Sequence, residues 1–391
     1  MKEVFVVDAL RTPFGSFGGQ LADIPAPRLA ATVLTRLLEK HALAAAAVSE
    51  VILGQVIQGG CGQAPARQAM RLAGIPDSAG AMTINKVCGS GLKSMMLGAQ
   101  AIACGDSEIV LAGGMESMSM APYAVPSARY GQRMGNAEML DLMIHDALKD
   151  PYSGRHMGEI TEAWIEANRV SRAEQDDFAE RSYRRAQAAL KNGTFAEELV
   201  PVVKAGRKGD VTISEDEEPL KVDFDKLRSL KTVFKKDGSI TAANASTIND
   251  GAAVALLASA EAVKAHNLKP IARILTSATQ SIAPELFPEA PIGAIQKAVA
   301  RAGLKLSDIG LFEINEAFSA VTYVAIRELG LDPERVNVNG GAVAIGHPVG
   351  ASGARLAATL LREMRVRKER YGLATLCIGG GEAVAVIFEL L

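Results

Sequence analysis

Short apolar runs alternate with segments of helical periodicity in the N-terminal part of the chain. The apolar runs predict strands at 4–8, 50–53 and 109–112. The periodic segments predict helices at 27–40, 64–73 and 92–104. Since strands joined through helices usually form parallel sheets covered on both faces, this alternation predicts a parallel-rich α/β sheet.

The alternation returns in the C-terminal part, with strands predicted at 272–279, 311–314 and 374–378 and helices at 292–302, 319–329 and 354–365. In each part a turn containing Ser-Gly opens a helix, and the strand that follows ends in Gly-Gly and then Glu (111–117 and 377–382). We infer an internal duplication, with two similar α/β halves. A functional site is expected at their junction, where strand ends converge.

The middle of the chain, from 113 to about 243, is less regular. Residues 115–133 are rich in Met, Ser, Pro and Tyr and predict a long ordered loop region, whereas 172–191 has the spacing of a charged amphipathic helix. A buried-type strand follows at 250–257. We therefore predict a first half made of 1–118 and 248–268, an inserted loop domain at 119–247, and a second half at 269–391.

Composition narrows the function classes. The 391 residues are 48% hydrophobic and 22% charged, a globular profile at a length typical of two or three domains. A net charge of −2 argues against a nucleic-acid partner. The chain has no apolar run long enough to span a bilayer, and it starts directly with a predicted strand rather than a leader. We expect a cytoplasmic protein without a membrane partner.

Four cysteines, Cys61, Cys88, Cys104 and Cys377, lie far apart, without a Cys-x-x-Cys pair or a His at ligand spacing. No metal site or disulfide framework is expected. Cys88 lies where a buried run turns sharply into an apolar helix. The N–H groups and dipole of a helix N-terminus favour a thiolate there. The alternative is a buried structural cysteine.

Three further residues offer matching chemistry. His347 lies in a Gly-His-Pro turn of small residues, and Cys377 precedes three glycines whose N–H groups could cradle a negative charge. Asn315 either holds an oxyanion or a water, or caps the following helix. Two thiols and an imidazole suit a reaction in which a thiolate attacks an acyl carbon, the imidazole activates it, and the second thiol takes a proton from a carbon next to a carbonyl.

Six stretches together resemble the signature blocks of thiolases, and they run from end to end. They are Arg-Thr-Pro-Phe-Gly (11–15), Asn-Lys-Val-Cys-Gly-Ser-Gly (85–91), Asn-Asp-Gly-Ala-Ala (249–253), Asn-Glu-Ala-Phe (315–318), Asn-Gly-Gly-Ala-Val-Ala-Ile-Gly-His-Pro (339–348) and Cys-Ile-Gly-Gly-Gly (377–381). The resemblance implies the duplicated thiolase fold, two similar βαβαβαββ halves in a layered αβαβα arrangement, with an inserted loop domain.

The resemblance also implies the roles of the four catalytic candidates. Cys88 would be the nucleophile that accepts an acyl group from acyl-CoA, and His347 would activate it and help to form an oxyanion hole. Cys377 would be the acid and base at the second substrate, and Asn315 would position a water at the enolate oxygen. Coenzyme A enters only as part of the substrate, and no prosthetic group is needed because the thioester itself acidifies the α-carbon.

The inserted domain resembles the part of thiolases that covers coenzyme A. By this resemblance the residues that contact coenzyme A are Leu148, His156, Met157, Lys221, Phe234, Ala242, Ser246, Ala317, Phe318 and Gly379. Without the family, Phe234 and Met157 would be interpreted as ordinary core side chains. The segment 115–133 resembles the one through which thiolases pair dimers into tetramers, so a homotetramer is expected.

The His-Met-Gly at 156–158 resembles short-chain biosynthetic thiolases, which join two acetyl-CoA into acetoacetyl-CoA by a ping-pong reaction through an acetyl-cysteine. The alternative is a broader degradative 3-ketoacyl-CoA thiolase of fatty-acid breakdown, because Phe287 stands where short-chain members often have Met. A decarboxylating ketosynthase would lack the thiol of Cys377. A non-catalytic lipid carrier would be expected to have lost the reactive residues.

Overall fold

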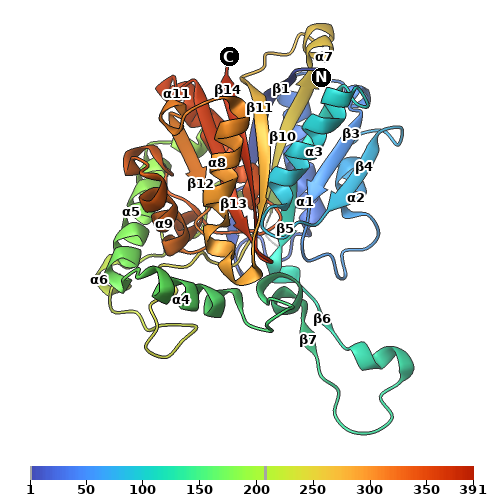
Figure 1. The fold of residues 1–391 in the computed structure, drawn as a ribbon. Coiled ribbons are helices and arrows are strands. Elements are labelled where there is room, and N and C mark those ends of the chain that lie inside the picture. Colours follow the sequence, from blue (N-terminus) through green and yellow to red (C-terminus); the bar gives the residue numbers. More distant parts are fainter. Residues whose placement is uncertain (1, 207–208) are drawn as a thin grey trace.

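The computed structural model describes residues 2–206 and 209–391. Met1, Arg207 and Lys208 fall within the predicted first half and inserted domain but outside the described residues. A ten-stranded sheet crosses the molecule in the order β12-β13-β14-β11-β1-β10-β5-β3-β4, with β2 beside β10 (Figure 1). Its strands are β1 (Val4–Arg11), β2 (Gly15–Ser16), β3 (Glu50–Gly54), β4 (Gly80–Ile84), β5 (Ile109–Ser117), β10 (Asn249–Ser259), β11 (Ala272–Ser281), β12 (Leu311–Ile314), β13 (Tyr371–Ile378) and β14 (Glu382–Leu390).

The strand order confirms the predicted duplication. From its outer edge inwards, the first half runs β4-β3-β5-β10-β1, and the second runs β12-β13-β14-β11. A parallel bridge between Phe312 and Val336 stands where β4 stands in the first half. The two halves meet where β1 and β11 pair antiparallel. One continuous sheet therefore carries the same arrangement twice.

The prediction of a parallel-rich sheet is wrong. Among the described strands, only β3–β4, β3–β5 and β12–β13 pair parallel, and the remaining pairs of the large sheet are antiparallel. Helices cover both faces, so these strands are apolar throughout whichever way they run, and an apolar run does not reveal its direction. The strand β14 was not predicted, and β5 continues through its Gly-Gly pair to Ser117 rather than ending there.

Six helices complete the expected layers. Helices α1 (Ala26–Lys40) and α2 (Pro65–Leu72) pack outside the first half. Helices α8 (Ala290–Ala302) and α9 (Ser319–Leu329) pack outside the second. Between them, α3 (Ser90–Cys104) and α11 (Ser352–Arg367) share one apolar cluster with strands of both halves. The layers are therefore α1 and α2, the first half of the sheet, α3 and α11, the second half of the sheet, and α8 and α9.

Glycines let the two central helices approach closely at their N-termini. A Cβ added to Gly91 in α3 would lie 2.9 Å from the backbone N of Ala354 and 2.9 Å from the carbonyl oxygen of Gly350. A Cβ on Gly353 in α11 would overlap the backbone of Leu92. No side chain fits between the two helices at these positions, so both must be glycine. The close approach brings together the turns that precede α3 and α11.

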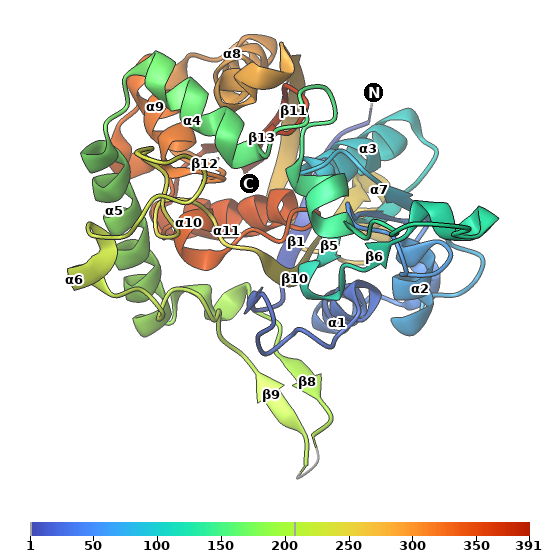
Figure 2. The ribbon, with the colours of Figure 1, turned by 90° about the horizontal axis from the view of Figure 1, so that it is seen from below.

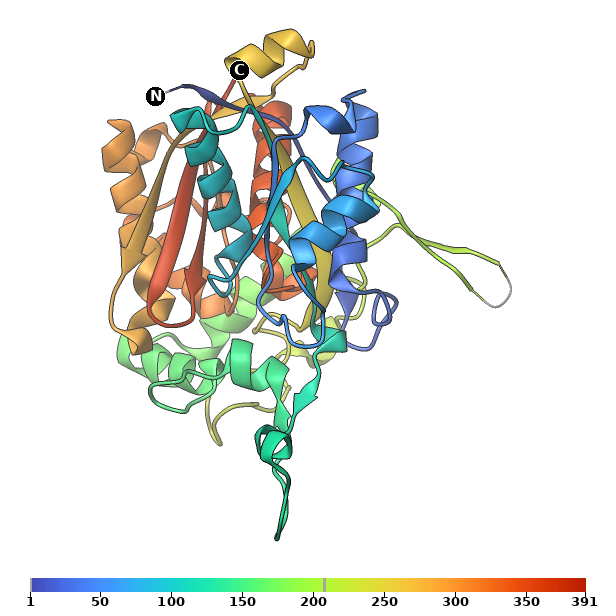
Figure 3. The same cartoon turned by 90° about the vertical axis from the view of Figure 1, so that its right-hand side faces the viewer.

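The chain between β5 and β10 forms the irregular part of the molecule. It contains the helices α4 (Met157–Asn168), α5 (Arg172–Lys191) and α6 (Phe224–Leu227), and the α5 bounds match the prediction. An arm bearing β6 (Tyr123–Ala124) and β7 (Leu140–Asp141) projects from the body (Figures 1 and 3). A second hairpin, formed by β8 (Val202–Lys204) and β9 (Val211–Ile213), projects from the body separately from this arm (Figure 2). The short helices α7 (Ala260–Ala265) and α10 (Ala342–Ile345) belong to the two halves.

No helix within the described ranges combines the length and the apolar character needed to cross a membrane.

Candidate active site

One cavity of about 560 Å³ collects most of the predicted site residues. Cys88, His347 and Cys377 line it together. So do all residues predicted to contact coenzyme A, namely Leu148, His156, Met157, Lys221, Phe234, Ala242, Ser246, Ala317, Phe318 and Gly379. Asn315 does not line the cavity. The site thus lies where the two halves and the irregular part of the chain meet.

The turn before α3 holds Cys88 through strain and local hydrogen bonds. Val87 has a φ of 46°, which is unfavourable for a β-branched residue. The side-chain oxygen of Asn85 accepts from Val87 N at 2.9 Å. The hydroxyl of Ser90 accepts from Lys86 N at 2.8 Å and donates to the carbonyl of Val87 at 2.7 Å. These bonds offset the strain and aim Cys88 at the cavity.

Backbone N–H groups favour a thiolate at Cys88, as predicted, but they are not the largest influence on its pKa. Burial raises the pKa of the Cys88 thiol to about 11, and hydrogen bonds from the backbone of Gly379 and of Cys88 itself lower it by less. Desolvation of a charged sulfur therefore outweighs the favourable dipoles. The thiol needs a base before it can act as a nucleophile.

His347 has the properties of that base. Its Nδ1 lies 2.5 Å from the hydroxyl of Ser352, which donates its own proton to the carbonyl of Pro348 at 2.9 Å. The hydroxyl must therefore accept from Nδ1–H, which leaves a lone pair on Nε2. That Nε2 is buried and has no hydrogen-bond partner among the described residues. Burial, helped by Arg355, lowers the pKa of His347 to about 3, so the ring is neutral.

Cys377 lies in β13, one residue before its end, and is buried. Burial raises the pKa of this thiol far above its usual range, and the nearby Cys88 raises it further. Cys88 and Cys377 line the same cavity. The three glycines after Ile378 form the turn into β14, in which Gly380 and Gly381 take φ values of 91° and 86°.

Asn315 follows β12 and is fully buried. Its backbone N donates to the carbonyl of Thr375 at 3.0 Å. The alternative that it caps the following helix is wrong, because the residue at the N-terminus of α9 is Phe318. The side-chain amide of Asn315 finds no hydrogen-bond partner within the described ranges. It is a buried polar group of the kind that holds a water or an oxyanion.

Sequence reasoning missed the role of Glu116, which is fully buried in β5. Its carboxylate accepts from the backbone N of Val56 at 3.0 Å, Ile57 at 3.1 Å and Gly350 at 2.9 Å. It therefore ties a loop of the first half to the turn that carries His347. Burial raises the pKa of Glu116 to about 8. The stretch of Gly-Gly and then Glu, which occurs in both halves, is the sequence feature that could have pointed to Glu116.

Aromatic rings form one wall of the cavity. His156 stacks on Phe234 with centroids 4.8 Å apart, and Phe234 meets Phe318 edge-on at 6.2 Å. A Cβ on Gly158 would overlap the Phe234 ring, so glycine is required there. His156 also caps α4, its Nδ1 accepting from Gly158 N at 3.0 Å. Stacking and capping together fix the imidazole.

Lys221 lies at the rim and is half exposed. Its ammonium contacts the hydroxyl of Ser16 and lies 3.0 Å from a carboxylate oxygen of Glu217 and 3.9 Å from one of Glu218. Several residues that line the cavity were not predicted, because loop segments carry no periodicity to reveal them. They include Ser16, Phe17, Met118, Ile144, Ala147, Glu218, Thr247, Ile248 and Val349.

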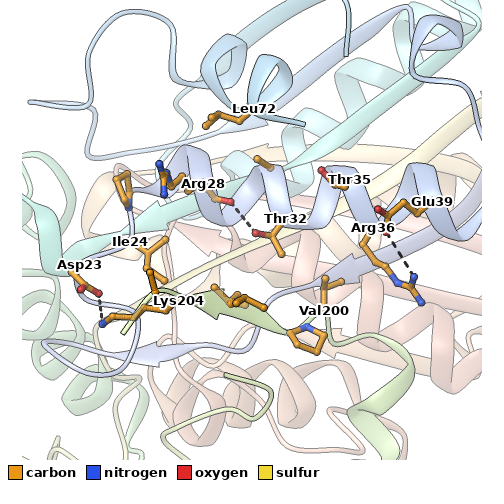
Figure 4. Close-up of a pocket in the computed structure, with 16 residues that line it drawn as sticks. Asp23, Ile24, Arg28, Thr32, Thr35, Arg36, Glu39, Leu72, Val200 and Lys204 are labelled. Carbon is orange, nitrogen blue, oxygen red and sulfur yellow. Dashed lines mark hydrogen bonds and ion pairs between the residues drawn. The ribbon is translucent and has the colours of Figure 1, made fainter. Parts of the chain in front are cut away.

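A larger groove of about 920 Å³ lies elsewhere, between α1 and the segment 200–205 (Figure 4). Its walls carry the ion pairs Lys204–Asp23 at 2.5 Å and Arg36–Glu39 at 4.0 Å. None of the predicted site residues lines it. Size alone therefore does not indicate the site, whereas convergent chemistry does.

Comparisons with known proteins agree with this geometry. An acetyl-CoA acetyltransferase of Pseudomonas aeruginosa is 51% identical over 388 residues, covering 99% of each chain. That of Shinella zoogloeoides is 49% identical over 387 residues, covering 99% of this chain and 98% of its own. The crystal structure of the Bacillus anthracis acetyl-CoA acetyltransferase matches with a TM-score of 0.97 at 40% identity, covering 100% of this chain and 99% of its own.

Residues 4–261 match the family model of the thiolase N-terminal domain, and residues 268–390 match that of the C-terminal domain. The thiolase fold expected from the sequence is confirmed by the structural match. With both domains present in order and nearly the whole chain covered, this chain belongs to the thiolase family.

Proposed function

We propose that this chain is an acetyl-CoA acetyltransferase, which condenses two acetyl-CoA into acetoacetyl-CoA and free coenzyme A, reversibly, through an acetyl-Cys88 intermediate. The observation that carries the proposal is the meeting of Cys88, His347 and Cys377 around one cavity. The names of the full-length relatives support the substrate class.

In the first half-reaction, Nε2 of His347 takes the proton of Cys88, and the thiolate attacks the thioester carbon. The oxyanion is held by the backbone N–H groups of Cys88 and Gly379, which already face the sulfur. The coenzyme A thiolate leaves and takes the proton of Cys377. The products are acetyl-Cys88, imidazolium at His347 and a thiolate at Cys377.

In the second half-reaction, the Cys377 thiolate takes a proton from the methyl carbon of a second acetyl-CoA. The enolate oxygen is stabilised by the imidazolium of His347 and by a water held on the buried amide of Asn315. The enolate carbon attacks acetyl-Cys88, and the departing Cys88 sulfur recovers its proton from His347. The proton of Cys377 leaves on coenzyme A and is replaced by one from the methyl carbon of the second substrate. All three residues end in their starting protonation states, so they need no prosthetic group for the cycle.

We place coenzyme A along the aromatic wall formed by His156, Phe234 and Phe318. The predicted inserted domain, 119–247, supplies most of the contacts, and Lys221 at the rim serves the phosphate-bearing end. Phe287 is buried between the cavity and α4 and limits the space for an acyl chain. This packing favours acetyl over longer acyl groups.

We also propose a homotetramer assembled through the projecting arm. Large apolar side chains are exposed along it, which favours burial against another copy. They are Met120, Tyr123, Tyr130, Met134 and Met139. Light scattering of the intact chain, compared with a variant carrying Ser at Tyr130 and Met134, tests the assembly. A wild-type monomer would refute it.

The function is tested by thiolysis of acetoacetyl-CoA and of a medium-chain 3-ketoacyl-CoA, each with free coenzyme A. We expect a strong preference for acetoacetyl-CoA, and loss of activity in Cys88→Ala. Cys104→Ala is the matched control, because Cys104 is exposed and lies outside the cavity. Equal or faster cleavage of the longer substrate would indicate a degradative 3-ketoacyl-CoA thiolase. No cleavage of either would refute the catalytic proposal.

A further inference from the structure

The turn that carries Cys88 and the triple-glycine turn come from opposite halves and lie against each other. A Cβ on Gly89 would overlap the side chain of Ile378. A Cβ on Gly379 would lie 3.7 Å from the side chain of Val87. The backbone of Gly379 also hydrogen-bonds the Cys88 sulfur. The position of one turn relative to the other therefore sets the distance from this N–H to the nucleophile.

An ion pair crosses the same boundary. Nζ of Lys86 lies 2.5 Å from a carboxylate oxygen of Glu382, and the other oxygen of Glu382 accepts from the hydroxyl of Ser281 at 3.1 Å. Lys86 stands two residues before Cys88, and Glu382 begins β14 directly after the glycines. The two side chains are only 22% and 31% exposed.

Both ends of the pair are held by their backbones. The N of Lys86 donates to the Ser90 hydroxyl at 2.8 Å, and its carbonyl accepts from Gly89 N at 3.0 Å. Glu382 is paired in the sheet with both Ile378 and Ser281. The backbone on each side is fixed, so an ion pair between the two side chains ties the turn before β14 to the turn that carries the nucleophile.

We propose that the Lys86–Glu382 ion pair is a positioning device, which holds the Gly379 N–H against the Cys88 sulfur during acyl transfer. The inference rests on the proposed function for its kinetic consequence. A partly exposed ion pair contributes little to stability, whereas a small misplacement of a catalytic group is costly in rate. The pair should therefore matter more to turnover than to folding.

A second lysine decides which substitutions to use. Burial lowers the pKa of Lys93, the nearby Lys86 lowers it further, and Glu382 raises it. Glu382 thus faces two positive groups, and a charge exchange with Lys86 would leave a lysine at 382 facing Lys93. Neutral variants of similar size, Lys86→Met and Glu382→Gln, remove the pair without adding a charge. Glu382→Gln leaves Lys86 and Lys93 to repel each other, whereas Lys86→Met and the double variant do not.

The test measures two quantities in Lys86→Met, Glu382→Gln and the double variant. We expect kcat for acetoacetyl-CoA thiolysis to fall about tenfold in each, with KM nearly unchanged and the double variant no worse than either. Alkylation of Cys88 by iodoacetamide at fixed pH, followed by peptide mass spectrometry and normalised to the exposed Cys104, should slow about fivefold, because the thiolate loses its N–H donor.

Matched controls are Lys204→Met and Asp23→Asn, which remove an ion pair of the same length in the groove of Figure 4. They should change neither quantity. Wild-type kcat and alkylation in the Lys86 and Glu382 variants would overturn the proposal, as would additive losses in the double variant. If wild type fails to cleave acetoacetyl-CoA while alkylation still slows in the variants, the proposed function fails and the positioning of Gly379 at Cys88 stands.

Discussion

The turn that opens α3 and the turn that opens α11 occupy corresponding places in the two halves, yet they present opposite chemistry to one cavity. The first offers a thiol whose pKa is raised, and the second offers an imidazole whose pKa is lowered. Both shifts have the same main cause, since burial disfavours the thiolate and the imidazolium alike. The duplicated frame thus keeps an acid and a base neutral until substrate arrives.

The two turns also differ in how they are held. Local hydrogen bonds and the pair with Glu382 hold the Cys88 turn. The His347 turn is held by distant residues: Asn249 accepts from His347 N at 2.9 Å, and Glu116 accepts from Gly350 N. The nucleophile therefore depends on its own turn and on an ion pair to the second half, whereas the base depends on two buried side chains of the first half.

The largest effect on the rate is expected when the base is removed, which tests whether the two turns divide the roles of nucleophile and base. We expect His347→Ala to slow acetylation of Cys88 about a thousandfold, a barrier increase of about 4 kcal/mol, because a thiol with a raised pKa keeps its proton when no base is present. A stopped-flow acetylation burst measures this step. Cys377→Ala is the control, since it should still be acetylated but should not condense. Equal acetylation of wild type and His347→Ala would assign the base elsewhere.

Adding one methyl group to each turn compares how tightly they pack. Gly353→Ala should cost about 3 kcal/mol of unfolding free energy, because the new Cβ meets the backbone of Leu92. Gly91→Ala should cost about 1 kcal/mol, since its closest contacts are at 2.9 Å. Urea denaturation measures both, with Gly80→Ala, whose nearest neighbour lies at 3.4 Å, as the control. The reverse order would refute this account of the close approach.

Glu116→Gln tests how far the turn that carries His347 depends on the hydrogen bond from Gly350 N to Glu116. Near pH 5 Glu116 is a neutral acid whose two oxygens can both accept, whereas the amide has one acceptor oxygen for three N–H groups, so we expect about 2 kcal/mol of lost stability and a lower kcat. The pKa of Glu116 is raised from 4.5 to about 8 in the folded protein. Its contribution to stability is therefore complete below pH 4.5 and lost as the pH rises through 8.

Glutamine does not titrate, so the advantage of wild type over Glu116→Gln should shrink from pH 5 upwards and reverse in sign by pH 8, because each pH unit between the two pKa values removes up to about 1.4 kcal/mol from wild type alone. Denaturation at both pH values measures this. A stability difference that is the same at both pH values would contradict the raised pKa of Glu116. It would not argue against the three hydrogen bonds that Glu116 accepts.

Ser352→Ala should have the smallest effect, and it isolates the hydrogen bond that orients the base. Without the hydroxyl, Nδ1–H of His347 loses its acceptor, and the tautomer with a free Nε2 is less favoured. We expect about a tenfold lower kcat, or about 1 kcal/mol, with KM unchanged. Ser352→Thr, which keeps the hydroxyl, should restore most of the rate. Equal losses in both variants would mean that the site responds to shape rather than to this hydrogen bond.

Much of the fold could be predicted from the sequence because it depends on local pattern. Helix α5, helix α9 and strand β12 were predicted with their observed bounds, since periodicity and flanking turns mark them directly. The duplication was visible in two Ser-Gly turns and two Gly-Gly-Glu stretches. The catalytic candidates came from ordered motifs, and three of the four share the cavity.

Strand direction, protonation and the contacts between the halves depend on tertiary packing. An apolar run has the same composition in either direction, so β1 and β10 gave no sign of their antiparallel pairing. The raised pKa of Cys88 reflects desolvation by segments far away in the chain. Glu116 and the Lys86–Glu382 pair join residues 59 to 296 positions apart. The order of amino acids alone identifies the residues that carry the chemistry, whereas packing sets their charge and alignment, because both depend on neighbours that only folding brings together.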